Sequence, residues 1–242
     1  MGIHPIRDET GFSVYAQPMS PPERESQAPP IDLPRGLVFG ASAWLAASWI
    51  ISIGIRPPVQ PTSISYTPAA RMLVVATMIG IIIAWPLLRL SASRPTRPLM
   101  SAILDTVSLV ALTQIVIWPL RLVTTWSVTR NLTISLDLLA CTIFVGGLLA
   151  LTAVTRRGGT AWMLALMGLV VAPPLLGLFV PMDPIHSPSP LLRIWALAGG
   201  GPGPLGTAAW SGGAFMAAMG VALWLTAARI SPSPLADQDG LR

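Results

Sequence analysis

The chain has 242 residues, of which 52% are hydrophobic and only 10% are charged, and its formal net charge is +5. Soluble domains carry about 25% charged residues, so this composition excludes an ordinary soluble protein. All fifteen Lys and Arg positions hold arginine. Without lysine there is no Walker A motif for phosphate binding and no lysine Schiff base. The arginines are dispersed between apolar segments, which argues against a nucleic-acid partner.

The first segment in chain order, residues 1–35, is polar, rich in proline and of mixed charge. Such a composition cannot bury a core, so we expect a disordered cytoplasmic arm. Residues 230–242 have the same character and predict a disordered cytoplasmic tail. The first apolar run starts too late and is too long for a cleaved signal peptide, so it predicts an uncleaved signal anchor.

Between these ends lie six apolar runs with few charges. They are found near residues 36–55, 69–88, 99–120, 132–154, 160–181 and 206–228. At about 1.5 Å per helical residue, a run of about 20 residues crosses the roughly 30 Å hydrocarbon layer of a bilayer. The sequence therefore predicts an all-α fold, a polytopic transmembrane bundle of six spans over residues 36–229.

The arginines between the runs predict the orientation of this bundle. With the N-terminus in the cytoplasm, ten arginines fall inside and five outside, which is the asymmetry that the positive-inside rule favours. The inside set is Arg7, Arg24, Arg35, Arg89, Arg94, Arg97, Arg156, Arg157, Arg229 and Arg242. We therefore expect both termini in the cytoplasm and a multi-pass protein of the bacterial inner membrane.

Three polar residues inside the runs are candidates for an intramembrane polar site: Asp105 and Gln114 in the third run, and Asp137 in the fourth. A carboxylate near the bilayer centre costs about 2.5 to 3.5 kcal/mol, so each aspartate is expected to face protein or water. In a functional interpretation, Asp137 and Gln114 line a path for an ion, a proton or a substrate. The two aspartates fall at different depths, so they do not form a catalytic dyad.

A structural interpretation of the same acids remains open. In this interpretation Asp137 pairs with Arg130 or Arg121, and Asp105 pairs with Arg97 or Arg94. Both ion pairs then only hold helices together.

The fifth run contains Pro173 and Pro174, which remove two amide donors and must kink or break a helix there. We interpret them as a candidate hinge, with ordinary helix packing as the alternative. After this run, Leu191 to Ala198 predicts a short interfacial helix carrying Arg193 and Trp195. Gly199 to Gly203 then predicts a flexible return into the membrane.

The sequence contains no metal-binding or cofactor-binding motif, and we expect that the chain is not an enzyme. Its only cysteine, Cys141, lies inside the fourth run and is expected to be a buried small hydrophobe. His4 and His186 fall on opposite sides of the predicted membrane, so they cannot share a metal. The runs contain neither histidine nor glutamate, so a nucleophile–base pair is not available to an intramembrane enzyme.

Small residues predict where helices approach closely. Ala209, Gly213, Ala217 and Gly220 form a stripe on the last run, and Gly36 with Gly40 makes a GxxxG pair on the first. Either pattern serves an internal seam or the face of an oligomer, and we favour internal packing.

One topological pattern resembles a known family. Six spans, both termini inside, and a short helix with a Pro/Gly-rich return over residues 188–210 resemble the membrane half of ABC-2-type exporters. The resemblance covers residues 36–229 and departs at residues 31–35 and 90–98, where such permeases usually carry an amphipathic helix and a coupling helix. It implies a permease-like subunit of a multi-component transporter, with a cytoplasmic ATPase or other membrane subunits as partners.

The alternative function is that of a non-transporting membrane scaffold or assembly factor. It predicts that both aspartates are ion-paired and that the cytoplasmic arm recruits partners. Both functions place the chain in the lipid bilayer.

Overall fold

The computed structural model describes residues 34–54, 62–92, 95, 97–155, 166, 168, 185, 189–200 and 205–231. All of them belong to one compact unit, Leu33–Arg242. The predicted hinge at Pro173 and Pro174 lies outside these residues, as do nearly all of the predicted arm and tail. Every regular element in the described part is helical, which confirms the all-α prediction there.

The described part of the chain contains the following helices, in chain order. Their bounds are Arg35–Trp49 (α1) continuing as the π-helix Ile50–Gly54 (η1), Ser63–Ile79 (α2) continuing through the π-helix Gly80–Ala84 (η2) into Trp85–Ser91 (α3), Pro98–Val123 (α4), Val128–Thr155 (α5), Pro190–Gly199 (α7) and Ala208–Ile230 (α8).

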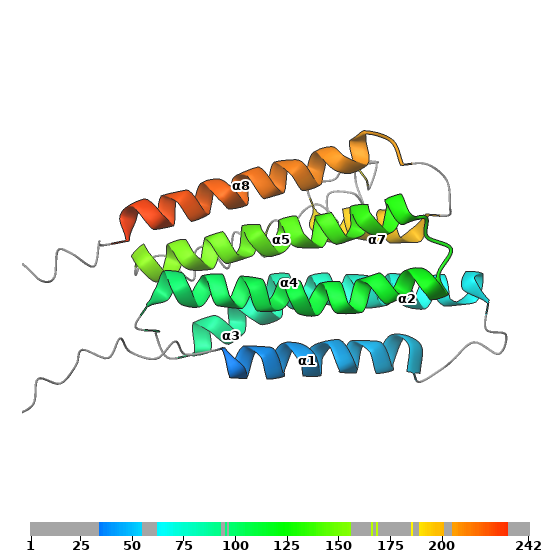
Figure 1. Cartoon of the computed structure of the whole chain (residues 1–242), viewed down its shortest axis with the longest axis horizontal. Helices are drawn as coiled ribbons and strands as arrows, with labels where there is room; N and C mark the ends of the chain where they lie inside the picture. The colour runs from blue at the N-terminus through cyan, green and yellow to red at the C-terminus, as the bar shows by residue number, and fades with distance from the viewer. Residues whose placement is uncertain are drawn as a thin grey trace, which may run out of the picture. The chain divides into compact units, whose positions relative to one another are not determined.

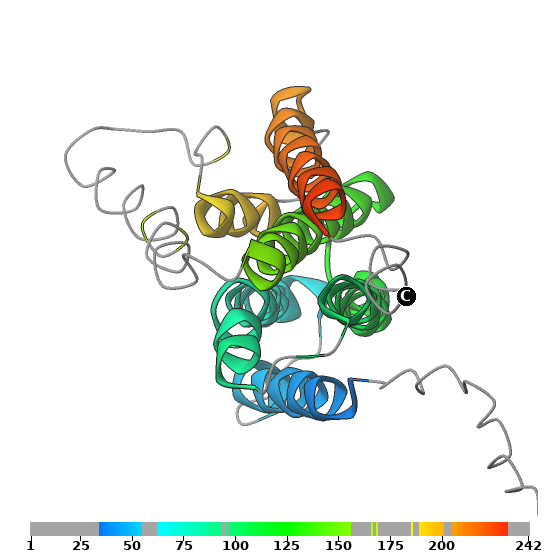
Figure 2. The same ribbon diagram turned by 90° about the vertical axis from the view of Figure 1, so that its left-hand side faces the viewer.

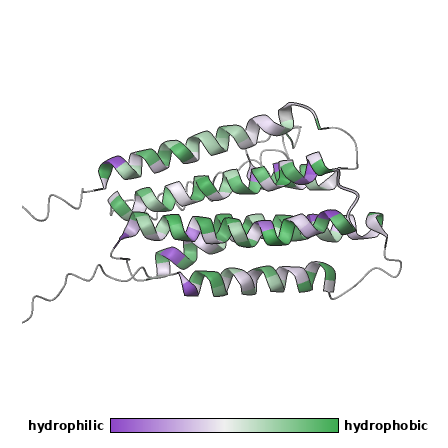
Figure 3. Ribbon diagram, in the orientation of Figure 1, coloured by the Kyte–Doolittle hydropathy of each residue, from purple (hydrophilic) through white to green (hydrophobic). Residues whose placement is uncertain are grey.

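Five continuous helices of the described part are long and apolar enough to cross a membrane. They run over Arg35–Gly54, Ser63–Ser91, Pro98–Val123, Val128–Thr155 and Ala209–Ile230. Figure 3 shows that most of this helical ribbon is hydrophobic. Five of the six predicted apolar runs are therefore helices of spanning length, and the run at 160–181 falls outside the described residues except for Leu166 and Gly168.

Helix α5 is central to the packing. It contacts α8 most extensively and α4 next, while α7 lies against α2 and α5. Seen from the side and from one end, α1 and α8 occupy opposite sides of the bundle (Figures 1 and 2). The start of α1 and the end of α8 lie at the same end of the bundle, and α7 lies toward the other end (Figure 1).

Local sequence explains where several helices begin. Thr62 caps α2 because its side chain accepts from the Ser65 amide, and the Ser65 hydroxyl accepts from the Thr62 amide in return. Pro98 and Pro190 stand in the first turns of α4 and α7, where a missing amide donor costs no helical hydrogen bond.

The small residues of α8 make the close contact with α5. A Cβ atom on Gly220 would lie 2.8 Å from the Phe144 backbone nitrogen, and one on Gly147 would lie 2.8 Å from the Gly220 carbonyl oxygen. The stripe on the last run thus packs internally, as predicted. The pair on the first run makes no comparably close approach within the described part of the chain: a Cβ atom on Gly36 would meet nothing within 4 Å there, and one on Gly40 would lie 3.5 Å from the Leu88 side chain.

Candidate functional site

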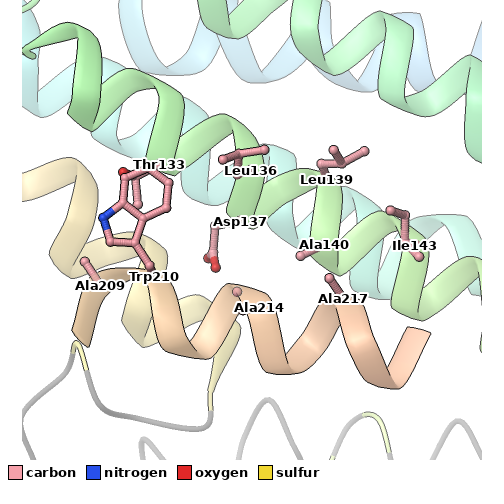
Figure 4. A pocket seen from close by; sticks show the side chains of 11 residues that line it. Thr133, Leu136, Asp137, Leu139, Ala140, Ile143, Ala209, Trp210, Ala214 and Ala217 are labelled. Carbon is pink, nitrogen blue, oxygen red and sulfur yellow. The ribbon is translucent and has the colours of Figure 1, made fainter. Parts of the chain in front are cut away.

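A buried ion pair joins α5 to the short helix α7. Arg193 donates from Nε to Asp137 Oδ1 at 2.9 Å and from Nη2 to the same oxygen at 2.5 Å. Both residues are only 2% exposed. Asp137 projects from α5 toward α8 in Figure 4, and Gly213 on α8 leaves room for the carboxylate because a Cβ atom there would lie 3.1 Å from Oδ1.

The structure corrects the partner expected for Asp137. The sequence favoured Arg130 or Arg121 because they are near in the chain, but the observed partner is Arg193. The reason is that α7 packs against α5 and brings a distant guanidinium to the acid. Arg130 is directed elsewhere, donating from Nη1 to the Leu197 carbonyl oxygen at 2.8 Å.

The C-terminal part of α7 is held by three donors from other parts of the chain. Arg71 on α2 donates to the Trp195 carbonyl at 2.9 Å. Arg130 on α5 donates to the Leu197 carbonyl oxygen, and the Trp126 indole N–H donates to the Ala198 carbonyl oxygen at 3.0 Å. Carbonyls at a helix C-terminus carry partial negative charge, so two guanidinium groups are well placed there.

The Arg71 guanidinium makes a second contact with α7. It lies over the Trp195 ring, 3.4 Å from the ring centroid. Cation–π contacts of this kind favour arginine over other cations. The contact fixes one face of α7 against α2.

Two glycines at the end of α7 admit these arginines. A Cβ atom on Gly199 would collide with the Arg71 guanidinium, and one on Gly200 would collide with that of Arg130. The sequence predicted a flexible return from Gly199 onward. The structure instead gives Gly199 and Gly200 a packing role, and Gly201 to Gly203 lie outside the described residues.

A short helix over Leu191 to Ala198 was predicted, and the helix Pro190–Gly199 is observed. One face of it, with Arg193, Ile194 and Leu197, is buried within the bundle. Its location at the membrane interface stays a prediction. The sequence signal for a buried face was the single arginine at the centre of an otherwise apolar helix.

A second ion pair lies between α3 and α4. Arg89 binds both carboxylate oxygens of Asp105 and donates from Nη2 to Ser101 Oγ at 2.7 Å. The prediction that Asp105 pairs with Arg97 is wrong, because the partner is Arg89 on the neighbouring helix α3, whereas Arg97 directly precedes α4. The other predicted partner, Arg94, lies outside the described residues. Asp105 is 1% exposed and the Arg89 side chain 23% exposed, so this pair reaches water on one side.

Gln114 is not brought to Asp137 by any contact in the described part of the chain. Its Oε1 accepts from Trp118 Nε1 at 3.0 Å, one turn further along α4. Asp137 faces α7 and α8 instead. The polar path through Gln114 and Asp137 stays a prediction.

Two further buried polar residues of α5, Asn131 and Ser135, were not proposed as site residues from the sequence. Among the described residues, both side-chain polar atoms of Asn131, the Ser135 hydroxyl and Asp137 Oδ2 have no hydrogen-bond partner. Leaving a buried polar group without a partner costs about 1 to 3 kcal/mol. Such groups concentrate in the part of α5 that contacts α7, which marks this region as the candidate site.

Two cavities lie among the described helices at places that bear on the site. One of about 250 Å³ lies between α5 and α8 and includes Asp137 in its wall (Figure 4). The other, of about 570 Å³, lies between α1, the α2–η2–α3 helix and α4. Its polar wall atoms include the Thr77 and Thr113 hydroxyls, which donate to carbonyls of their own helices. The second cavity is therefore almost entirely apolar.

The described residues hold no cluster of side chains suited to a metal ion. Cys141 is a free, buried thiol on α5. Comparison with protein-family models, curated proteins and solved structures gives no match to this chain. Fold and composition define the class of the protein: the described part is that of a multi-pass helical membrane protein. Ion pairs lie at two of its helix contacts, and that between Asp137 and Arg193 is fully buried.

Proposed function

We propose that this chain is a permease-like membrane subunit of a multi-component transporter, possessing the general plan of an ABC-2-type exporter component. The observation that carries the proposal is α7, a short helix that lies within one end of the bundle and is held there by buried charge. Ionisable groups in a membrane are expensive and are by default markers of function. The resemblance drawn from the sequence places a short helix at this point of the chain.

The course of the helices supports the six-span arrangement within this proposal. Helix α5 ends at the end of the bundle where α1 starts, whereas α8 starts at the opposite end (Figure 1). A chain that links these two points passes from one end of the bundle to the other. With both termini in the cytoplasm of a bacterial cell, α7 lies on the outer side of the inner membrane.

A second candidate function, a non-transporting scaffold or assembly factor, is favoured by one specific observation. Both intramembrane aspartates are ion-paired, Asp105 with Arg89 and Asp137 with Arg193. Ion pairs that only clamp helices need no substrate and no energy source. The two candidates differ in whether an ATPase binds the chain and whether Arg193 is needed for transport.

The deciding experiment is purification of the tagged full-length chain in mild detergent, followed by identification of stoichiometric partners and assay of ATP hydrolysis. A permease-like subunit is expected to retain an ATPase on its cytoplasmic end. Arg193→Gln is then expected to keep the ATPase bound but to lose transport, because α7 lies at the other end of the bundle. Ala218→Leu, a change at an exposed position of α8, serves as the control. Reproducible purification without any ATPase would refute the proposal and favour the scaffold.

A further inference from the structure

The larger of the two cavities, about 570 Å³, is an apolar groove on the side of the bundle. Its walls come from α1, α4 and the continuous helix α2–η2–α3. Leu87 and Leu88, two wall residues on α3, are about half exposed, so the groove is open to its surroundings. In a bilayer those surroundings are lipid, and water does not fill an apolar space of this kind.

The dimensions of the groove match one hydrocarbon chain. Along α2–η2–α3 its wall runs from Thr77 to Ser91, which is about 20 Å at the helical rise of about 1.5 Å per residue. One leaflet contributes about 15 Å to the hydrocarbon layer. The volume equals roughly 19 water molecules of about 30 Å³ each, and a methylene group is close to water in size. One acyl chain of a phospholipid therefore fits, and two do not.

Two arginines lie at one end of this groove. The wall ends at Ser91 on α3 and at Leu37 on α1. Arg89 precedes Ser91 by two residues, and Arg35, the first residue of α1, precedes Leu37 by two residues. The start of α1 and the end of α3 lie at the same end of the bundle (Figure 1). The apolar groove thus has a basic end where a helix begins and another stops.

Arg89 retains a donor that a ligand can use. Its Nε and Nη2 atoms bind Asp105 and Ser101, which leaves Nη1 without an acceptor among the described residues. The side chain is 23% exposed, and Nη1 is not among the unpartnered polar atoms that are closed to solvent in the described part. A ligand oxygen can therefore bind Nη1 without disturbing the ion pair.

The formal charge at this end favours an anion. Asp105 compensates Arg89, and the other acid of the described part, Asp137, is paired with Arg193. Arg35 therefore has no carboxylate partner within that part of the chain, and it is exposed. It stands in the first turn of α1, where the helix dipole disfavours a cation, so the helix itself gains nothing from this charge. A phosphate group supplies the missing negative charge.

We propose that the groove binds one acyl chain of an anionic phospholipid, whose phosphate lies between Arg35 and Arg89 and accepts from Arg89 Nη1. The chain gains burial against the apolar walls, and the phosphate gains a charge-assisted hydrogen bond. A lipid of zero net charge lacks the electrostatic part of this recognition, and a free phosphate lacks the chain. The site goes beyond the proposed transport function and stands whether or not the chain transports.

The test is native mass spectrometry of the full-length chain in detergent, titrated with three probes. They are dipalmitoyl phosphatidylglycerol, dipalmitoyl phosphatidylethanolamine and glycerol 3-phosphate. Binding of phosphatidylglycerol is expected to saturate at one molecule, with phosphatidylethanolamine about tenfold weaker because it has no net charge. Glycerol 3-phosphate is expected not to be retained. Equal affinity for the two lipids, binding of phosphatidylglycerol that does not saturate, or retention of glycerol 3-phosphate overturns the proposal.

Two variants of α1 locate the chain. Ala41→Phe fills the groove from α1 and is expected to abolish the saturable binding. Ala43→Phe adds the same side chain at an exposed position of α1 outside the groove and is expected to bind as the parent does. Continued protection of the Cys141 thiol shows that each variant is folded. Unchanged binding by folded Ala41→Phe refutes the site.

Two further variants locate the phosphate. Arg35→Gln is expected to weaken the binding of phosphatidylglycerol about fivefold and to leave that of phosphatidylethanolamine unchanged. Arg229→Gln removes an exposed arginine at the same end of the bundle, but on α8, which lies on the opposite side from α1 (Figures 1 and 2). It is expected to bind as the parent does. Equal losses in the two variants would show that only the general surface charge attracts the lipid, and would overturn the proposal even if Ala41→Phe did not fold.

Discussion

Arg193 and Asp137 are 56 positions apart in the chain, yet Arg193 Nε donates to Asp137 Oδ1 at 2.9 Å. Their side chains are 3% and 2% exposed, so neither charge is compensated by water. Each residue is therefore the other's main source of charge compensation. The packing of α7 on α5 depends on both.

The first prediction concerns this pair. Asp137→Leu leaves the Arg193 charge buried without a counter-ion, and breaking a buried ion pair costs about 3 to 5 kcal/mol of unfolding free energy. The double variant Asp137→Leu with Arg193→Met removes both charges and is expected to regain most of that loss. Unfolding in detergent, followed by circular dichroism, measures the two single variants, Asp137→Leu and Arg193→Met, and the double variant. A double variant whose loss equals the sum of the two single losses would show that the residues are not coupled.

The second ion pair is expected to be more tolerant. Asp105→Asn frees Arg89, but this side chain is 23% exposed and can turn its charge toward water. The loss of unfolding free energy should therefore be smaller than for Asp137→Asn, measured by the same method. An equal or larger loss for Asp105→Asn would mean that water does not reach Arg89.

A third prediction concerns the end of α7. Gly200→Ala places a methyl group against the Arg130 guanidinium and should displace it from the Leu197 carbonyl. Overpacking of this kind typically costs about 1 to 3 kcal/mol. The matched control is Gly206→Ala, since a Cβ atom there meets no described residue within 4 Å. Comparable melting temperatures for the two variants would contradict a packing role for Gly200.

The single cysteine provides a fourth test. Cys141 is 1% exposed on α5, so its thiol should resist a maleimide in the folded protein and react after denaturation in SDS. The rate of labelling then reports on opening of the bundle. Rapid labelling of the folded wild-type chain would show that the centre of α5 is accessible.

A fifth prediction addresses orientation. In a Cys141→Ser background, Leu122→Cys lies near the C-terminus of α4, at the end of the bundle where α7 lies, and Ala92→Cys lies between α3 and α4 at the other end (Figure 1). Both positions are exposed. With cytoplasmic termini, a membrane-impermeant maleimide should label Leu122→Cys on intact spheroplasts and Ala92→Cys only after permeabilisation. The reverse pattern would invert the proposed topology.

The spanning helices were predictable because hydropathy is a local property of about 20 consecutive residues. The partners of the charges were not, because they depend on how helices far apart in sequence pack together. Arg130 is seven positions before Asp137 on the same helix and looked like its partner, but its guanidinium extends to α7. A glycine beside a predicted loop also suggests flexibility, whereas a Cβ atom on Gly200 would overlap the Arg130 guanidinium where it donates to the Leu197 carbonyl oxygen.

The attachment of α7 has a consequence for how the protein is made. The donors to its terminal carbonyls, Arg71, Trp126 and Arg130, and its acid partner Asp137 all precede it in the chain. During synthesis these groups leave the ribosome before α7 does, so α7 can dock as soon as it emerges. The helix that follows, α8, then closes over α5 and α7, with Gly212 against Arg193.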